Sequence, residues 1–251
     1  MITQYRFLLA APDGRPLPAS TAYRLYAWLL GQLPEALGDA WHQPGQSPLT
    51  QHLSRDISGR EVWTLNLLSD EAAGLLAPVL DGLSDIPLHA GTLAAQPLGM
   101  PGRVAAQELL LQAQQLPDTR RRELRFLTPT AFRQDGRYAI WPQERLLLQS
   151  LTLRWNELFP EFSLRDEDAL EALRRGLFIT DYRLATTRYP LKNVRIPGFY
   201  GSVWVESRLP APLEEIWRLL LCFLPYAGVG VKTTLGMGGC RLGQAREDCQ
   251  K

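Results

Sequence analysis

The order of apolar patterns along this chain occurs twice, and this repeat limits the possible folds more than any single motif does. In the first half, "TQYRFLLAA" alternates as a strand does, and "LPASTAYRLYAWLLGQLPEAL" has helical spacing behind an N-cap at Ser20 or Thr21. Two strands follow in "SPLTQHLSRD" and "REVWTLNLLS", then a helix capped by Ser69 in "DEAAGLLAPVLDGL" and a last strand in "IPLHAGTLAAQPL". This βαββαβ order is that of a ferredoxin-like unit.

The second half repeats the order with different residues. A strand in "ELRFLTPTAF" precedes a helix in "ERLLLQSLTLRWNELF", which "DEDALEALRRGL" extends. Strands in "FITDYRLATTRYP" and "RIPGFYGSVWVES" follow, then a helix in "APLEEIWRLLLCFL" and a closing strand in "GGCRLGQAR". We therefore predict an α+β protein of two tandem ferredoxin-like (RRM-like) domains, at residues 1–99 and 122–251, with a linker over residues 100–121.

Cysteine usage and hydropathy exclude several classes of protein. The three cysteines, Cys222, Cys240 and Cys249, form no Cys-x-x-Cys pair, which argues against a disulfide framework or a structural zinc site. The chain opens directly on a strand pattern, so no signal peptide is expected. The longest apolar run, "IWRLLLCFLPYAGVGV", contains Arg218 and Pro225 and is too short to span a bilayer. We expect a cytoplasmic protein with no membrane contact.

The charges are unevenly divided between the two halves. Residues 1–119 carry 6 basic and 11 acidic side chains, a net −5, whereas residues 120–251 carry 21 and 15, a net +6. Arginine provides 24 of the 27 basic residues, for which a GC-rich genome is a sufficient explanation. Genome composition does not explain the basic second half, which is a usual footprint of nucleic-acid binding. The "RRR" run at residues 120–122 is expected to be exposed at a domain junction.

The segment "AGVGVKTTLGMGG", residues 227–239, has a lysine and two threonines among five glycines. It is not a nucleotide-binding P-loop, because Val231 separates Gly230 from Lys232 and the segment follows a helix and precedes a strand. Two interpretations remain: a helix-to-strand connector that needs glycine for positive φ, or a nest of backbone N–H groups that binds polynucleotide phosphates. The number of glycines favours the nest. Its predicted RNA-binding residues are Gly228, Gly230, Lys232, Thr233, Gly236 and Gly238.

A glycine-rich loop between the last helix and last strand of a tandem ferredoxin-like protein resembles that of the RAMP superfamily. Three further stretches narrow the resemblance: "FLTPTAFR" (Phe126–Arg133), "RWN" (Arg154–Asn156) and "IPGFYGSVWVE" (Ile196–Glu206). With "PYAGVGVKTTLGMGG" they are similar to the CRISPR-associated endoribonucleases that cut precursor CRISPR RNA within its repeats. The resemblance covers nearly the whole chain and is more specific in the second domain.

The resemblance implies a reaction and a set of partners. The enzyme would be a ribonuclease without metal or other cofactor, leaving a 2′,3′-cyclic phosphate and a 5′-OH. Its partner would be CRISPR repeat RNA, with subunits of a CRISPR effector complex as possible further partners. The sequence leaves the oligomeric state open, a homodimer included.

Such a reaction needs proton transfer to and from oxygen, which suits histidine because its pKa lies near the operating pH. The resemblance places His42, in "WHQPGQSPLT" after the first helix, at the catalytic position; a surface histidine is the alternative. His52, within a predicted strand, is a second candidate for a catalytic or supporting role, and His89 in "IPLHAG" is expected to be structural. Tyr26 or Tyr23 of the first helix would supply the phenol that some relatives use, unless both are packing residues.

One departure from the family concerns a lysine. "SPLT" stands where many relatives have Lys-Pro-Phe-Thr, and no lysine occurs before Lys192. We expect Arg55, Arg60 or Lys232 to compensate by stabilising the charge on the phosphate.

The connector "RYPLKNVR" between two strands of the second domain carries Arg188, Lys192 and Arg195. A basic hairpin tip can enter the groove of an RNA stem, where phosphates and shape dominate recognition, although an ordinary solvated loop would have the same composition.

Two other functions are compatible with the sequence. One is a RAMP subunit that binds CRISPR RNA and cuts nothing. The other is a small-molecule-binding protein whose acidic first half holds the substrate. RNA binding should weaken steeply with salt, whereas small-molecule binding should not.

Overall fold

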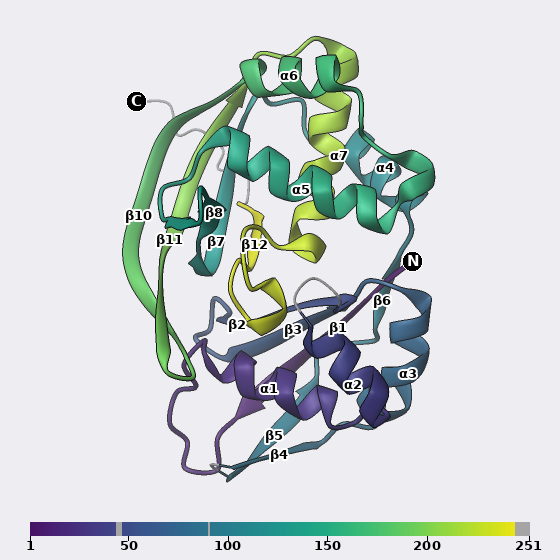
Figure 1. Ribbon diagram of the computed structural model, residues 1–251, viewed down its shortest axis with the longest axis vertical. Coiled ribbons are helices and arrows are strands. Elements are labelled where there is room, and N and C mark those ends of the chain that lie inside the picture. The colour runs from purple at the N-terminus through teal and green to yellow at the C-terminus, as the bar shows by residue number, and fades with distance from the viewer. Residues whose placement is uncertain (44–46, 90, 244–251) are drawn as a thin grey trace.

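The computed structural model describes residues 1–43, 47–89 and 91–243 and contains one main antiparallel sheet from each half of the chain (Figure 1). The first sheet has the strand order β2-β3-β1-β5-β4, and the short β6 also pairs with β1. Its strands are β1 (Ile2–Ala10), β2 (Leu49–Arg55), β3 (Glu61–Leu67), β4 (Asp85–Leu88), β5 (Gly91–Pro97) and β6 (Gly102–Val104). The helices of this half are α1 (Thr21–Leu30), α2 (Glu35–His42) and α3 (Asp70–Leu80).

The second sheet has the strand order β10-β11-β7-β12, beside a small β8-β9 hairpin. Its strands are β7 (Arg121–Thr130), β8 (Phe132–Gln134), β9 (Arg137–Ala139), β10 (Leu177–Leu191), β11 (Val194–Ser207) and β12 (Cys240–Leu242). The helices are α4 (Ala106–Gln115), α5 (Glu144–Leu158), α6 (Glu167–Gly176) and α7 (Ala211–Ala227), with 3₁₀ turns η1 (Pro160–Phe162) and η2 (Thr233–Leu235). With β5 counted as the fourth strand, both sheets have the order 2-3-1-4, which confirms two tandem ferredoxin-like units.

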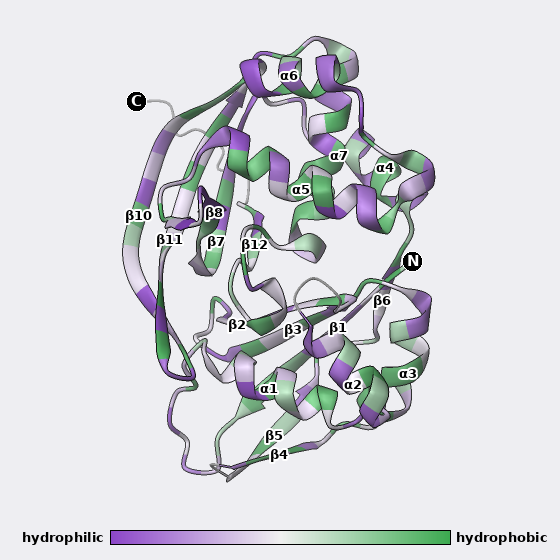
Figure 2. Cartoon of the chain, in the orientation of Figure 1, coloured by the Kyte–Doolittle hydropathy of each residue, from purple (hydrophilic) through white to green (hydrophobic). Residues whose placement is uncertain are grey.

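Each unit has an apolar core between its sheet and its helices. In the first, Phe7 of β1 packs with Leu25 of α1 and Leu76 of α3. In the second, the rings of Phe126 and Phe199 meet edge to face, with centroids 4.9 Å apart, inside the core that α5 and α7 cover. Figure 2 shows hydrophobic and hydrophilic residues alternating along α5, as expected of a helix with one face on a sheet. Among the described residues no helix is both long and apolar enough to cross a membrane.

Two predicted elements have different ends in the structure. The first helix was expected to run through Leu37, but it ends at Leu30, and α2 begins after Pro34, because a proline disfavours helical backbone before it. His42 is therefore the last residue of a helix and not a loop residue. The predicted last strand of the first unit is a hairpin of β4 and β5, and His89 is exposed in its turn instead of lying within a strand.

The segment predicted as a linker, residues 100–121, contains β6 and α4, neither of which was predicted. β6 pairs with β1 of the first unit, whereas Leu109 and Ala113 of α4 are buried in the core of the second. The segment thus connects both units physically, and the domain boundaries stay a prediction.

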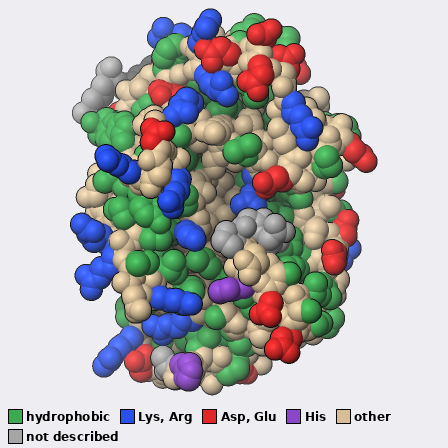
Figure 3. All heavy atoms as spheres, viewed as in Figure 1, with side chains coloured by type: hydrophobic (Ala, Val, Ile, Leu, Met, Phe, Trp, Pro, Cys, Tyr) green, Lys and Arg blue, Asp and Glu red, His purple; other side chains and the backbone are tan. Residues whose placement is uncertain are grey.

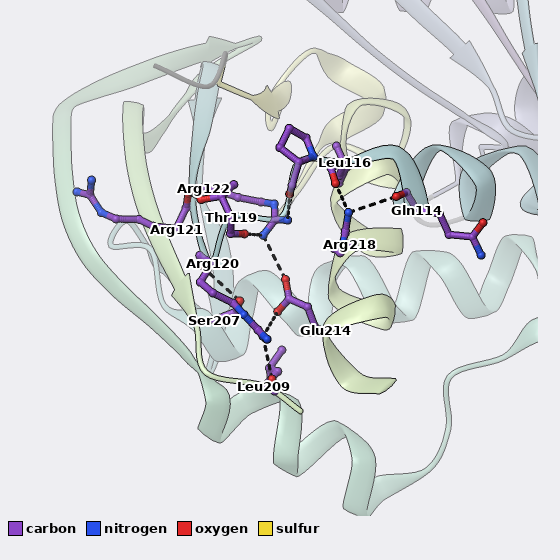
Figure 4. A network of polar contacts seen from close by, with 11 residues as sticks. Gln114, Leu116, Thr119, Arg120, Arg121, Arg122, Ser207, Leu209, Glu214 and Arg218 are labelled. Carbon is purple, nitrogen blue, oxygen red and sulfur yellow. Dashed lines mark hydrogen bonds and ion pairs between the residues drawn. The ribbon is translucent and has the colours of Figure 1, made fainter. Parts of the chain in front are cut away.

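The arginine run at residues 120–122 is not simply exposed, because Arg122 is buried, with 6% of its surface accessible. Its Nη1 lies 3.2 Å from an Oε1 of Glu214 on α7, and its guanidinium also donates to the carbonyls of Pro117 and Thr119 (Figure 4). Arg120 donates to the same carboxylate at 3.4 Å. The prediction of an exposed run is wrong because Glu214, far away in the sequence, places a buried carboxylate beside Arg122. A buried charge needs such a partner.

We predict that Glu214→Ala lowers the free energy of unfolding by about 3–5 kcal/mol, because it leaves the buried Arg122 guanidinium without its carboxylate. Urea unfolding followed by circular dichroism measures the change. Glu215→Ala, the adjacent exposed carboxylate, is the matched control and should stay within about 0.5 kcal/mol of wild type. Equal free energies of unfolding for the two variants would show that the buried pair of Arg122 and Glu214 does not stabilise the fold.

Candidate functional site

A cleft of about 470 Å³ lies where helices α1 and α2 of the first unit face the glycine-rich segment of the second. The first unit contributes Tyr23, Tyr26, Trp41 and His42 to its walls. The second unit contributes Arg133, Tyr138, Arg154, Lys192, Lys232 and Thr233. The described residues that line it include four Lys or Arg side chains and no Asp or Glu. The cleft is therefore suited to an anionic ligand.

Basic residues also dominate part of the surrounding surface. In Figure 3, Lys and Arg side chains gather mostly along the left side of this face, and Asp and Glu lie mostly toward its right side and top. Such a separation raises the local concentration of anions near the basic side.

His42 reaches the cleft because α2 ends there. The preceding residue, Trp41, is buried and fixes the end of the helix, while His42 itself is exposed. The hydroxyl of Tyr26 donates a hydrogen bond of 2.6 Å to the carbonyl oxygen of Trp41. An imidazole on a fixed helix end and open to solvent can exchange protons with a ligand.

The two tyrosines predicted as candidates both line this cleft, but they differ in environment. Tyr26 is buried, and burial raises the pKa of its phenol. Its proton is already donated to Trp41, so its geometry fits the support of α2. Tyr23, one turn earlier, is half-buried, and its hydroxyl has no hydrogen-bond partner among the described residues.

The glycines of residues 227–239 let the two units approach closely. A Cβ on Gly236 would lie 2.4 Å from the Cβ of Ala22 on α1, and a Cβ on Gly239 would lie 2.6 Å from Cγ of His52 on β2. Gly236 also has φ +99°, which side chains rarely adopt. The connector interpretation therefore accounts for these two glycines through packing.

Most glycine N–H groups of the segment are used inside the protein. Gly228 donates to Leu224, Gly230 to the Ser150 hydroxyl and Gly238 to Pro129, at 2.9–3.1 Å. These three N–H groups are not free for phosphate. The predicted RNA contacts of Gly228, Gly230, Gly236 and Gly238 stay predictions.

The tip of the segment has free donors instead. Lys232 has left-handed backbone, with φ 59°, and its side chain is exposed. The N–H groups of Lys232, Thr233 and Thr234 have no acceptor within the described part of the chain. Arg154 of α5 lies 3.4 Å from the Thr233 hydroxyl. Three consecutive N–H groups beside two cations form the kind of concavity that binds anions.

The side chain of Gln51 on β2 joins the two walls of the cleft. It is 1% exposed, and its Nε2 donates to the carbonyls of Ala22 on α1 and Thr234 in η2, both at 2.8 Å. Its Oε1 accepts from the indole N–H of Trp63 at 2.7 Å. Because every donor and acceptor of this buried amide has a partner, it fixes the position of the segment tip relative to α1.

The long β10-β11 hairpin also crosses from the second unit to the first (Figure 1). The Tyr189 hydroxyl near its tip donates at 2.6 Å to Leu235 and lies 3.2 Å from the carbonyl of Ala19. Lys192 occupies its turn with φ 49° and lines the cleft. The other predicted RNA-binding residues of the hairpin, Arg188 and Arg195, are exposed and do not line the cleft.

His52 lies elsewhere. It is 7% exposed, outside the cleft, and packs against Gly239 where the two units meet. Burial, with smaller contributions from Arg6 and Arg241, lowers the pKa of His52 to about 4. This is the environment of a neutral core histidine, and a catalytic role for His52 stays untested.

Among the cleft residues that the sequence analysis does not predict are two arginines and a tyrosine: Arg133, Tyr138 and Arg154. The first two lie on the β8-β9 hairpin, whose turn is Asp135–Gly136 with φ 50° and 75°. Asp-Gly between short strands is a strong hairpin signal and could have revealed it. Arg154 belongs to "RWN", one of the stretches that carry the family resemblance.

Two arginines suggested as replacements for the missing lysine do not line this cleft. Arg55 pairs with Glu61 at 3.3 Å, and Arg60 pairs with Asp56 at 2.8 Å. Lys232, the third suggestion, does line it. Across residues 1–43, 47–89 and 91–243, no group of three or more His, Cys, Asp or Glu side chains is arranged to hold a metal ion.

A family model described as CRISPR-associated endoribonuclease Cas6 matches residues 124–240. The CRISPR-associated endoribonuclease Cas6 of Streptococcus thermophilus is 30% identical over 234 residues, which cover 90% of this chain and 93% of that protein. The protein of the same name from Mycobacterium tuberculosis is 28% identical over 239 residues, covering 92% of this chain and 74% of that one.

Solved structures agree with these relatives. A structure described as a Cas6 product complex has a TM-score of 0.77 and 27% identity, covering 97% of this chain and 100% of that chain. Thermus thermophilus Cas6 has a TM-score of 0.74 at 24% identity, over 96% of this chain and 98% of that one, a likeness of fold.

We predict that acid destabilises the protein through His52. Its pKa of about 4 in the folded protein is below the ordinary value of 6.5. Between pH 6.5 and pH 4 the unfolded chain therefore binds a proton at His52 and the folded chain does not. Stability should fall as the pH decreases from 6.5 toward 4, by roughly 3 kcal/mol from this group.

Urea unfolding of wild type and His52→Gln between pH 4 and 7 isolates the effect, because other titrating groups are common to both. The variant should lose less stability over this range. His42→Gln, at an exposed histidine, is the control and should follow wild type. Parallel curves for wild type and His52→Gln would refute the assignment.

Proposed function

The chain belongs to the CRISPR-associated endoribonuclease Cas6 family, and we propose that it cuts precursor CRISPR RNA within its repeats. The observation that carries this proposal is the convergence of His42 from the first unit with Lys192, Lys232 and Arg154 from the second in one cleft free of described carboxylates. A titratable group beside several cations is what cleavage of a phosphodiester requires.

In the proposed reaction the 2′-OH attacks the adjacent phosphorus in line. A bond forms between the 2′-oxygen and phosphorus, and the bond from phosphorus to the 5′-oxygen breaks. The products are a 2′,3′-cyclic phosphate and a 5′-OH, and no metal ion takes part. The proton leaves the 2′-OH and another is delivered to the departing 5′-oxygen.

His42 is the proposed general base or acid, because it is exposed at the end of α2 and lines the cleft. Tyr26 would support it through the hydrogen bond to Trp41. The hydroxyl of Tyr23 is the better placed phenol for the second proton transfer, since Tyr26 has already donated its proton.

Charge on the phosphate would be stabilised by Lys232 and the adjacent N–H groups of Thr233 and Thr234. These donors lie at the tip that Gln51 fixes, so they need little rearrangement during the reaction. Lys232 would thereby replace the lysine that many relatives carry after the histidine.

We predict that wild type cuts a labelled repeat RNA from its own genome in EDTA and leaves a cyclic phosphate, which acid opens and phosphatase then removes. His42→Ala should lower the single-turnover rate by about 10²–10⁴-fold because one proton transfer is lost, with Kd little changed. His89→Ala, at an exposed histidine of a distant turn, should cut at the wild-type rate.

A wild-type protein that binds the repeat and does not cut it would be a non-catalytic RNA-binding subunit. Salt-insensitive binding of a small molecule, with no affinity for RNA, would contradict both the endoribonuclease and the RNA-binding subunit. If His42→Ala cuts the repeat at the wild-type rate, His42 is neither the general base nor the general acid.

We predict that Lys232→Gln weakens repeat binding and reduces the slope of log K against log salt by roughly 0.7–0.9, because one phosphate contact is lost. Fluorescence anisotropy at 50–300 mM salt measures it. Arg60→Gln, an exposed cation paired with Asp56 outside the cleft, is the matched control and should keep the slope. An unchanged slope for Lys232→Gln would remove Lys232 from the phosphate contacts.

A further inference from the structure

The β8-β9 hairpin contributes an aromatic side chain, Tyr138, to the cleft that His42 also lines. Tyr138 of β9 and Arg133 of β8 are cross-strand partners, and both line the cleft that His42 lines. Phosphate binding accounts for Arg133 but not for Tyr138, because a phosphate needs donors and charge but no ring. We propose that Tyr138, backed by Arg133, is a stacking site for the nucleobase beside the scissile phosphate.

The ring of Tyr138 is available to a ligand. The guanidinium carbon of Arg133 lies 5.7 Å from its centroid, a cation–π distance, and thus covers one side of the ring. Tyr138 is nevertheless 36% exposed, so part of its surface stays open toward the cleft. Tyrosine rings and arginine planes are the groups on which proteins stack unpaired RNA bases.

The β8-β9 hairpin is attached to the segment that carries Lys232. The carbonyl oxygen of Ala131, directly before β8, accepts a hydrogen bond of 2.9 Å from the N–H of Val231, the residue before Lys232. Gly230 packs so closely here that a Cβ would lie 2.2 Å from the same oxygen. Phe132 is buried against Phe199, with ring centroids 6.3 Å apart. The hairpin that carries Tyr138 is therefore joined to the residues next to Lys232 by a hydrogen bond and by close packing.

This arrangement matches a nucleotide and not a lone anion. A nucleotide presents a phosphate on one side and a flat base on the other, and the cleft has cations and N–H donors at η2 and a ring on the hairpin. Stacking discriminates little between bases, so the site would position any nucleotide next to the cut. The inference rests on the proposed function, since it assigns a subsite of the same cleft.

The test combines a protein variant with a change in the RNA. The RNA is the repeat with a 2′-deoxy nucleotide at the cleavage point, which removes the attacking hydroxyl, and with single abasic residues placed in turn at the positions flanking the cut. Kd is measured for wild type, Tyr138→Leu and Tyr138→Phe. Tyr138→Leu should weaken binding of the intact RNA by about 5- to 150-fold, the range of base–aromatic stacking. Tyr138→Phe keeps the ring and should stay within about threefold.

At one flanking position the abasic residue should abolish the difference between wild type and Tyr138→Leu, because the stacking partner is already missing. At the other positions the difference should persist. Thermal unfolding of each variant controls for folding, and Phe162→Leu, at an exposed aromatic outside the cleft, controls for loss of a surface ring.

Equal loss with every abasic RNA would show that Tyr138 acts through the protein fold and would overturn the stacking site. An unchanged Kd for Tyr138→Leu would also overturn it. If wild type cuts the natural repeat, but no abasic position removes the difference in Kd between wild type and Tyr138→Leu, only this inference fails. If wild type neither binds nor cuts the repeat, the proposed function and the stacking site fail together.

Discussion

The site depends on the contact between the glycine-rich segment and the edge of the first sheet. Gln51 on the edge strand β2 bonds to α1 and to η2 through one buried amide. Together with the Tyr189 hydroxyl, which bonds to Leu235 and Ala19, this contact fixes the tip that carries Lys232 relative to α1. Displacement of the tip would leave a polar group of this buried amide without a partner, which costs free energy.

The glycine-rich segment, residues 227–239, contains glycines that pack against the first unit and other residues that line the cleft. The glycines next to the first unit, Gly236 and Gly239, leave space for Ala22 and His52 and so allow close packing. The residues between the glycines, Lys232 to Thr234, line the cleft, and their N–H groups have no acceptor among the described residues. Close packing between the units therefore explains why the segment has more glycine than a turn requires, and in the proposed function the residues between the glycines bind phosphate.

Much of the fold could be predicted because strand and helix periodicity are local properties. Both βαββαβ repeats, the Ser69 cap and the β10-β11 hairpin are confirmed. The errors arose where local signals compete. Pro34 divides one apolar pattern into α1 and α2, and the Asp135–Gly136 turn forms a β8-β9 hairpin inside a segment with no predicted element. Arg122 was misjudged because its partner, Glu214, is 92 residues away in the sequence.

The sequence by itself determined the two ferredoxin-like units, the basic second half and the short list of histidines and lysines available for chemistry. Only the tertiary structure decided which of them meet. His42 and Lys232 share a cleft, whereas His52 is buried between the units with its pKa lowered and His89 is remote on a turn. The physical reason is that burial and proximity arise when two independently patterned units pack, and no local pattern specifies the face that each presents to the other.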